Sequence, residues 1–249
     1  MNILVCISSV PDTTSKINFT NNNQSFDNNG VTFIINPYDE FCLTKAIFIK
    51  EQSAATITVL NVGESANDAI LRKALAIGAD KAIRINQAPE NSKIVSECIA
   101  NYCMENEFDL IFCGRESIDY NGGQVPGFLA AKLKLPFINS CIGLEFKEKT
   151  LVLKREIDSG HELCECSLPA IIAGQKGLVE EKDLRIPSMR GIMTARTKPL
   201  EVIEANIVQE KIVKIIEYNK PTERSECKLI EEENINQLVD LLSSEAKVI

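Results

Sequence analysis

The sequence predicts an α/β fold built on a doubly wound, mainly parallel sheet, with an antiparallel hairpin extension and a C-terminal arm. Three observations support this prediction. Short apolar runs alternate with helical patterns of roughly 10–15 residues over the first half of the chain. The apolar runs are continuous, as in parallel strands that are covered on both faces. Turn residues separate the segments.

The first strand is expected from Ile3 to Ile7, and Pro11 and Asp12 end it. The asparagine-rich stretch at 21–30 has turn chemistry and few apolar residues, so an excursion from the sheet is expected there. The short run from Thr32 to Ile35 predicts a strand.

A helix is expected to begin at residues 36–39, because Leu43, Ala46 and Ile47 recur at helical spacing after them. An aspartate near a helix start commonly accepts hydrogen bonds from the free backbone amides there. We therefore expect Asp39 to cap this helix.

The next segments repeat the strand and helix alternation. Strands are expected at Thr56–Val62, Ala82–Ile85 and Leu110–Cys113, and helices at Asp68–Ile77 and Lys93–Asn106. Gly78 stands where a C-terminal cap belongs. This order of elements predicts βαβ units.

The pattern changes after a strand at Phe137–Ile142. Two runs, Leu151–Ile157 and Glu162–Ser167, flank turn residues and predict a hairpin, and Ala170–Ala173 predicts another strand. Residues 174–199 show no sustained period and predict a long exposed loop, which is commonly functional.

The last segment shows strand-like alternation at 207–216, a polar linker at 219–225 and a helical apolar face formed by Ile235, Leu238, Val239 and Leu242. We therefore expect an α/β domain over residues 1–200, including the loop at 175–196, and an arm over residues 201–249.

Composition excludes several classes of protein. The chain of 249 residues has 27 basic and 35 acidic residues, a net charge of −8, so it lacks the basic surface that nucleic acid requires. No apolar stretch is long enough for insertion into a membrane. Nine cysteines lie mostly inside apolar segments, which is typical of reduced, buried thiols. A cytoplasmic location is expected.

The loop after the strand that ends at Cys113 is a candidate ligand site. In doubly wound sheets, ligands bind beyond the carboxyl ends of the strands, where the loops after Ile7, Ile35 and Cys113 should converge. The third loop, 114–128, combines small residues with Pro126 at the expected first turn of a helix. Exposed amides and a helix N-terminus favour phosphate binding there. A tight turn between strand and helix would use the same residues.

Residues for covalent or acid–base catalysis are not evident. No P-loop or G-x-G-x-x-G motif follows a strand. His161 is the sole histidine and stands in a predicted turn facing solvent, while Cys164 and Cys166 lack the common zinc spacing and predict structural thiols. No metal site and no catalytic residue are therefore predicted.

Short motifs along most of the chain, to about residue 205, resemble beta subunits of electron-transfer flavoproteins, in order and spacing. These motifs are Val10-Pro11-Asp12-Thr13, Asn36-Pro37-Tyr38-Asp39-Glu40, the segment 71–80, Ser117-Ile118-Asp119 with Gln124, the segment 155–160, Leu168-Pro169-Ala170 and Gly191-Ile192-Met193. The resemblance implies an adenine-nucleotide-binding, Rossmann-like fold. It also implies an alpha-subunit partner that holds FAD, and AMP bound in this chain.

Carried over by position, the resemblance implies which residues bind AMP. They are Cys6, Asn36, Pro37, Tyr38, Asp39, Val62, Ser117, Ile118, Asp119, Tyr120, Asn121, Gly122, Gly123, Gln124, Val125, Pro126, Gly127 and Phe128. Thr13 and Tyr38 would lie nearest the flavin of the alpha subunit. The arm would wrap that subunit.

The resemblance further implies that the loop at 175–196 recognises partner dehydrogenases and that Met189 docks into them. The heterodimer would carry electrons from dehydrogenases such as acyl-CoA dehydrogenase to a quinone oxidoreductase, as a carrier without acid–base residues of its own. Ser8 and Glu116 depart from the family pattern. Glu116 would repel phosphates unless Arg115 offsets its charge.

Two alternatives stay open at this point. A flavin-bifurcating relative would hold a second FAD in place of AMP and oxidise NADH; the motif Val10-Pro11-Asp12-Thr13 is common in that branch. A stand-alone nucleotide-binding sensor resembling universal stress proteins would share the layout of the sheet, although its phosphate motif does not fit Gly114, Gly122 and Gly123.

Overall fold

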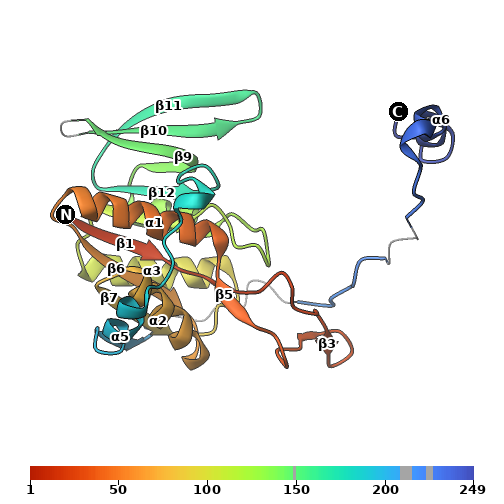
Figure 1. The fold of residues 1–249 in the computed structure, drawn as a ribbon. Helices are drawn as coiled ribbons and strands as arrows, with labels where there is room; N and C mark the ends of the chain where they lie inside the picture. The colour runs from red at the N-terminus through yellow and green to blue at the C-terminus, as the bar shows by residue number, and fades with distance from the viewer. Residues whose placement is uncertain (148–149, 208–214, 223–226) are drawn as a thin grey trace. The chain divides into compact units, whose positions relative to one another are not determined.

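The computed structural model describes residues 1–147, 150–207, 215–222 and 227–249. Within them, nine strands form one sheet in the order β11-β10-β9-β12-β8-β1-β6-β7-β13. Helices cover both faces of its parallel part (Figure 1). The predicted α/β fold with a doubly wound, mainly parallel sheet is confirmed.

The parallel strands begin with β1 (Asn2–Cys6) in the middle of the sheet. On one side follow β6 (Thr56–Val62), β7 (Lys81–Asn86) and β13 (Leu200–Glu204), and on the other β8 (Leu110–Gly114), β12 (Ala170–Gly174) and β9 (Phe137–Lys147). The chain runs from β1 through β6 to β7 and then crosses to β8. The strand order therefore reverses between β1 and β8, which are parallel neighbours.

Two pairs of helices supply the cores. Residues of α1 (Pro37–Gln52) and α2 (Asp68–Ile77) pack on one face of the sheet, and residues of α3 (Ser92–Glu105) and α4 (Val125–Leu133) pack on the other. Continuous burial along β1 and β8 agrees with their unbroken apolar sequence. The predicted strands and helices of this region are confirmed.

The hairpin extension consists of β10 (Thr150–Ile157) and β11 (Gly160–Ser167), which pair antiparallel with each other; β10 also pairs antiparallel with β9. His161 is exposed at the start of β11. Cys164 and Cys166 are half-buried and point to the core side of this strand. Structural thiols are what the sequence predicted for this pair.

Residues 174–199 do not form the featureless exposed loop that we expected. They contain a short 3-10 helix, η2 (Glu181–Asp183), and the helix α5 (Met189–Ala195). Leu178, Val179 and Ala195 are buried. The helix α5 was not predicted because most of its apolar side chains face solvent. Its sequence therefore lacks the apolar periodicity of a helix that packs on a core.

A strand that the sequence reading missed follows α5. β13 pairs in parallel with β7 at the edge of the sheet, so residues 201–204, which we had assigned to the arm, lie in the sheet. Another short sheet joins β2 (Ser9–Pro11) to β5 (Phe33–Ile35) in antiparallel pairing. The strand predicted at 32–35 is β5.

Residues 19–26 and 215–249 form a separate compact unit. It contains the hairpin of β3 (Phe19–Thr20) and β4 (Ser25–Phe26), in which the ring of Phe19 stacks on that of Tyr218 with centroids 4.8 Å apart. It also contains η3 (Glu232–Asn234) and α6 (Ile235–Ser244), the helix predicted from its apolar face. The strand-like pattern predicted at 207–216 lies mostly outside the described residues, as does part of the linker at 219–225.

Candidate functional site

Asp39 joins the ends of the two strands between which the strand order reverses. Its Oδ2 accepts a hydrogen bond from the amide of Ser8 after β1 at 2.7 Å, and its Oδ1 accepts one from the amide of Gly114 at the end of β8 at 2.8 Å. The expectation that Asp39 caps α1 is wrong. The N-cap residue is Asn36, and the carboxylate instead satisfies amides from two neighbouring strands.

Asp39 is almost fully buried, with 2% of its surface exposed. Burial disfavours the charged form and raises the pKa of this carboxyl group to about 7, against the lowering effect of the hydrogen bonds from Ser8 and Gly114. A carboxyl group at the C-terminal ends of β1 and β8 therefore titrates near neutral pH.

Asn36 holds the loop that follows β8. Its Nδ2 donates to the carbonyl of Glu116 at 2.9 Å, and its Oδ1 accepts from the amide of Ile118 at 3.3 Å. Its own amide donates to the carbonyl of Ser8 at 3.0 Å. The structure thus brings together the segment 36–39, the end of β1 and the first part of the predicted phosphate loop.

The other face of the same edge is apolar. Cys6 and Val62 are buried in one hydrophobic cluster with Cys113, and Val125 packs against that cluster. A hydrogen bond with Cys113 and burial raise the pKa of the Cys6 thiol well above its usual range, so the thiol stays neutral. These residues offer an apolar wall of the kind that an adenine ring requires.

The loop from Asp119 to Gln124 is exposed and leads into α4. Asn121 and Gly123 have positive φ angles of 49° and 58°, which turn the chain sharply. Within the described part of the chain, the backbone amides of Gly122, Gly123 and Gln124 have no protein acceptor within hydrogen-bond distance. Pro126 stands in the first turn of α4, as predicted. Free amides before a helix N-terminus suit a phosphate group.

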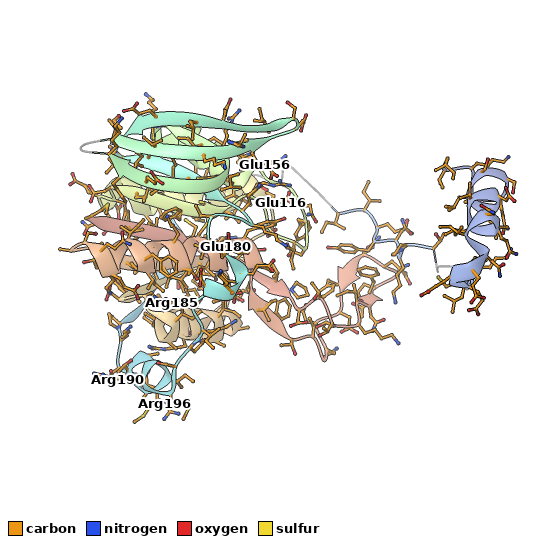
Figure 2. The ribbon with its side chains drawn as sticks, turned by 45° about the horizontal axis from the view of Figure 1, so that its top comes forward. Glu116, Glu156, Glu180, Arg185, Arg190 and Arg196 are labelled. Carbon is orange, nitrogen blue, oxygen red and sulfur yellow. The ribbon has the colours of Figure 1, made fainter. Side chains whose placement is uncertain are left out.

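Arg115 offsets the charge of Glu116 that had put phosphate binding in question. Its Nη2 lies 3.0 Å from Oε1 of Glu116, its Nη1 donates to Oε1 of Gln175 at 3.0 Å, and Gln175 in turn donates to Glu156. The guanidinium carbon of Arg115 stands 6.0 Å from the centre of the Tyr38 ring. Figure 2 shows Glu116 and Glu156 close together in this region.

Arg115, Glu116, Gln175 and Glu156 form a cluster of polar side chains. The sequence did not identify three of them, Arg115, Gln175 and Glu156, as site residues. Gln175 is 4% exposed, although it directly follows β12. The hydrophobic pattern of the sequence cannot predict the burial of a polar side chain when a segment distant in the sequence covers it. The one usable signal was the position of Arg115 and Gln175 directly after two adjacent parallel strands.

Of the other predicted residues, Tyr38 lies beside Arg115, as its ring contact shows. Thr13 is exposed in the segment after β2, and Tyr38 is half-buried in the first turn of α1. Met189 begins α5 and is 80% exposed. In Figure 2, Arg190 and Arg196 of the α5 segment are drawn well away from Glu116 and Glu156. The α5 segment and the group around Glu116 therefore occupy different parts of the domain.

Among the described residues, no group of three or more His, Cys, Asp or Glu side chains could hold a metal ion. Nor does any helix there reach the length and apolar character needed to cross a membrane.

The doubly wound sheet, with buried apolar side chains and the free amides before α4 at its carboxyl edge, defines a protein of the α/β class. The family model for the electron transfer flavoprotein domain matches residues 25–208. The electron transfer flavoprotein subunit beta of Bacillus subtilis is 36% identical, over 100% of both chains. This chain belongs to the electron-transfer flavoprotein family, among its beta subunits.

Two further relatives extend the comparison. The electron transfer flavoprotein subunit beta of Syntrophomonas wolfei is 35% identical, over 94% of this chain and 91% of its own. The acryloyl-CoA reductase electron transfer subunit gamma of Anaerotignum propionicum is 29% identical, over 85% of this chain and 80% of its own. Beta subunits of this family form heterodimers with an alpha subunit, act in complexes that bind flavin, and pass electrons to redox partners.

Proposed function

We propose that this chain binds AMP at the carboxyl edge of β1, β6 and β8, pairs with an FAD-holding alpha subunit, and carries electrons from acyl-CoA and related dehydrogenases to a quinone reductase. The observation that carries the proposal is the run of free amides at Gly122–Gln124 before α4. The flavin of the complex would supply the electron-carrying ring. Residues of this chain would hold the nucleotide and meet the partners.

The residues present fit an adenosine phosphate. The free amides offer donors for its phosphate, and Cys6, Val62 and Val125 offer an apolar wall for its base. Asn36 and Asp39 fix the loops on either side of the site through backbone groups, at 2.7–3.3 Å. Glu116 is paired with Arg115, so its charge is offset at this edge.

The test is to co-express the chain with its alpha subunit, denature the purified complex and identify the released nucleotides by mass spectrometry. We expect one FAD and one AMP per heterodimer. A complex without AMP, or a chain that associates with no flavin-holding subunit, would contradict the proposal.

A flavin-bifurcating role is the second candidate, because one relative is named as an electron transfer subunit of acryloyl-CoA reductase. In that role this chain would hold a second FAD at the same edge and the complex would oxidise NADH. Two FAD per heterodimer and rapid bleaching by NADH would favour it over the AMP-binding carrier. The family model over residues 25–208 and the Bacillus subtilis relative that matches the whole chain favour both functions over a stand-alone stress sensor.

A docking role for Met189 gives a mutational prediction. Met189→Ala should slow electron transfer from a partner dehydrogenase roughly thirtyfold, or about 2 kcal/mol, if the exposed thioether is a hot-spot anchor. Stopped-flow reduction of the heterodimer measures this rate.

Met104→Ala is the matched control for that prediction, because Met104 is also exposed but lies on α3, on the other face of the sheet. Its transfer rate should equal that of the wild type. Equal rates for both variants would remove Met189 from the docking site.

A further inference from the structure

The exposed loop before α4 contains an Asn-Gly pair, Asn121-Gly122. Asn121 has a φ of 49°, in the left-handed region, which asparagine tolerates better than most residues. A sharp turn is therefore enough to explain its presence. The pair also has a chemical property that a turn does not use. Asparagine is chemically labile, and it is most labile before glycine, which has no side chain to hinder attack by its backbone nitrogen.

The reaction converts asparagine to an acidic residue in two steps. The backbone nitrogen of Gly122 attacks Cγ of Asn121 and forms a new C–N bond. The C–N bond of the side-chain amide breaks, and the amide leaves as ammonia with the proton of the Gly122 N–H. Water then opens the five-membered succinimide ring at either of its carbonyl groups. The product is aspartate, or isoaspartate, in which the backbone runs through the side chain.

The structure leaves both reacting groups free. In the described part of the chain, the amide of Gly122 has no protein acceptor and the side chain of Asn121 makes no hydrogen bond. A Cβ atom at Gly122 would meet only Oγ of Ser92, at 3.8 Å, so the loop has room to rearrange. Neither reacting group must give up a hydrogen bond to reach the other.

The start of α4 favours this reaction when the loop is empty. The helix begins at Val125, directly after the free amides of Gly123 and Gln124, and a helix N-terminus carries a partial positive charge. Such a field stabilises the deprotonated nitrogen of Gly122 and the negative oxygen that develops on Cγ of Asn121. The same field attracts a phosphate group. Phosphate binding and attack on Asn121 therefore compete for the amide of Gly122.

We propose that Asn121 is a site of spontaneous deamidation, that phosphate bound at Gly122–Gln124 protects it, and that deamidation of the empty loop disables phosphate binding. The inference rests on the proposed function. A bound phosphate accepts the N–H of Gly122 and keeps its nitrogen protonated. In the empty loop, the new carboxylate repels phosphate, and isoaspartate also displaces the amides that would bind it. A molecule that has lost its nucleotide thus loses the ability to bind it again.

An internal control is present in the same chain. Asn29-Gly30 is the other Asn-Gly pair of the sequence, and both of its residues are exposed. The side-chain amide of Asn29 donates to Oδ1 of Asp27 at 2.8 Å. This pair lies outside the loop before α4, so its deamidation should not depend on the nucleotide.

The test is incubation of the purified heterodimer in mildly alkaline buffer, with excess AMP or after dialysis that removes its AMP. Peptide mapping by mass spectrometry reports each site separately, because deamidation replaces an NH group by oxygen. At an AMP concentration about 100-fold above the Kd, Asn121 should deamidate at least about tenfold more slowly than in the AMP-free sample. Asn29 should react at the same rate in both samples.

Two variants test the chemistry and its consequence. Gly122→Ala adds a Cβ atom that hinders the attacking nitrogen, so Asn121 should deamidate at least severalfold more slowly in the AMP-free sample. Asn121→Asp carries the charge of the product and should bind AMP about tenfold more weakly than the wild type. This difference in affinity should become smaller at high salt, because salt screens the repulsion between the two negative charges.

The outcomes separate the inference from the proposed function. Equal deamidation of Asn121 with and without bound AMP, or no reaction there while Asn29 reacts, would overturn the inference and leave AMP binding standing. Equal rates for Gly122→Ala and the wild type, or full AMP affinity of Asn121→Asp, would do the same. A heterodimer that neither contains nor binds AMP would overturn the proposed function, and the inference with it.

Discussion

Replacement of Gly114 by alanine should disrupt the nucleotide site and destabilise the domain by about 3 kcal/mol. A Cβ atom at this position would lie 2.3 Å from Oδ1 of Asp39, 2.8 Å from Cβ of Tyr38 and 3.0 Å from Nδ2 of Asn36. Cβ of Tyr38 is fixed to the backbone of α1, and the side chains of Asp39 and Asn36 are held by their hydrogen bonds to Gly114 and Glu116. Urea unfolding followed by circular dichroism measures the loss.

Gly122→Ala is the matched control for that substitution. A Cβ atom there would meet only Oγ of Ser92, at 3.8 Å, so stability should change by less than about 0.5 kcal/mol. Gly114→Ala should also reduce the AMP that co-purifies with the heterodimer. Equal stability of Gly114→Ala and the wild type would show that the contact between Gly114 and α1 is not tight.

The second large effect is a dependence of stability on pH that comes from Asp39. Burial raises the pKa of its carboxyl group from 3.8 to about 7 in the folded protein. Between these values the folded state binds a proton that the unfolded state has lost, so this group's contribution to stability decreases as pH rises and is constant above about 7. The difference corresponds to a decrease on the order of 4 kcal/mol, as an upper limit.

Asp39→Asn removes this titration. The free energy of unfolding of the wild type, minus that of the variant, should decrease as pH rises from about 4 to about 7 and should then be level. A difference that stays level over this pH range would show that Asp39 titrates at its ordinary pKa in the folded protein.

The sequence predicted the sheet well because its central strands are buried on both faces. β1, β8 and β12 contain continuous apolar runs, and nothing outside each run was needed to recognise it. β13 escaped prediction because it is an edge strand, in which Val202 is 46% exposed. Helix α5 escaped for a similar reason, since Ala195 is its one buried residue.

The sequence predicted the position of the candidate site, but it did not predict the hydrogen bonds that hold the site together. The position of the free amides followed from small residues between a strand and a proline-started helix. The role of Asp39 did not follow, because its two partners lie 31 and 75 residues away in the sequence. Local rules place an aspartate near a helix start as a cap, and only tertiary packing reveals that it joins two strands.

The attachment of α5 to α2 has a consequence for how such a protein can diversify. Nη1 of Arg72 donates to the carbonyl of Ala195, and a Cβ atom at Gly191 would stand 2.2 Å from the carbonyl oxygen of Ala76. These contacts fix the backbone of α5 on the face of the sheet that bears α1 and α2, whereas the free amides lead into α4 on the opposite face. Side chains at 186, 189, 190 and 193 can therefore vary without disturbing the loop that carries the free amides. The exposed surface of α5 and the loop before α4 can thus change independently on the same fold.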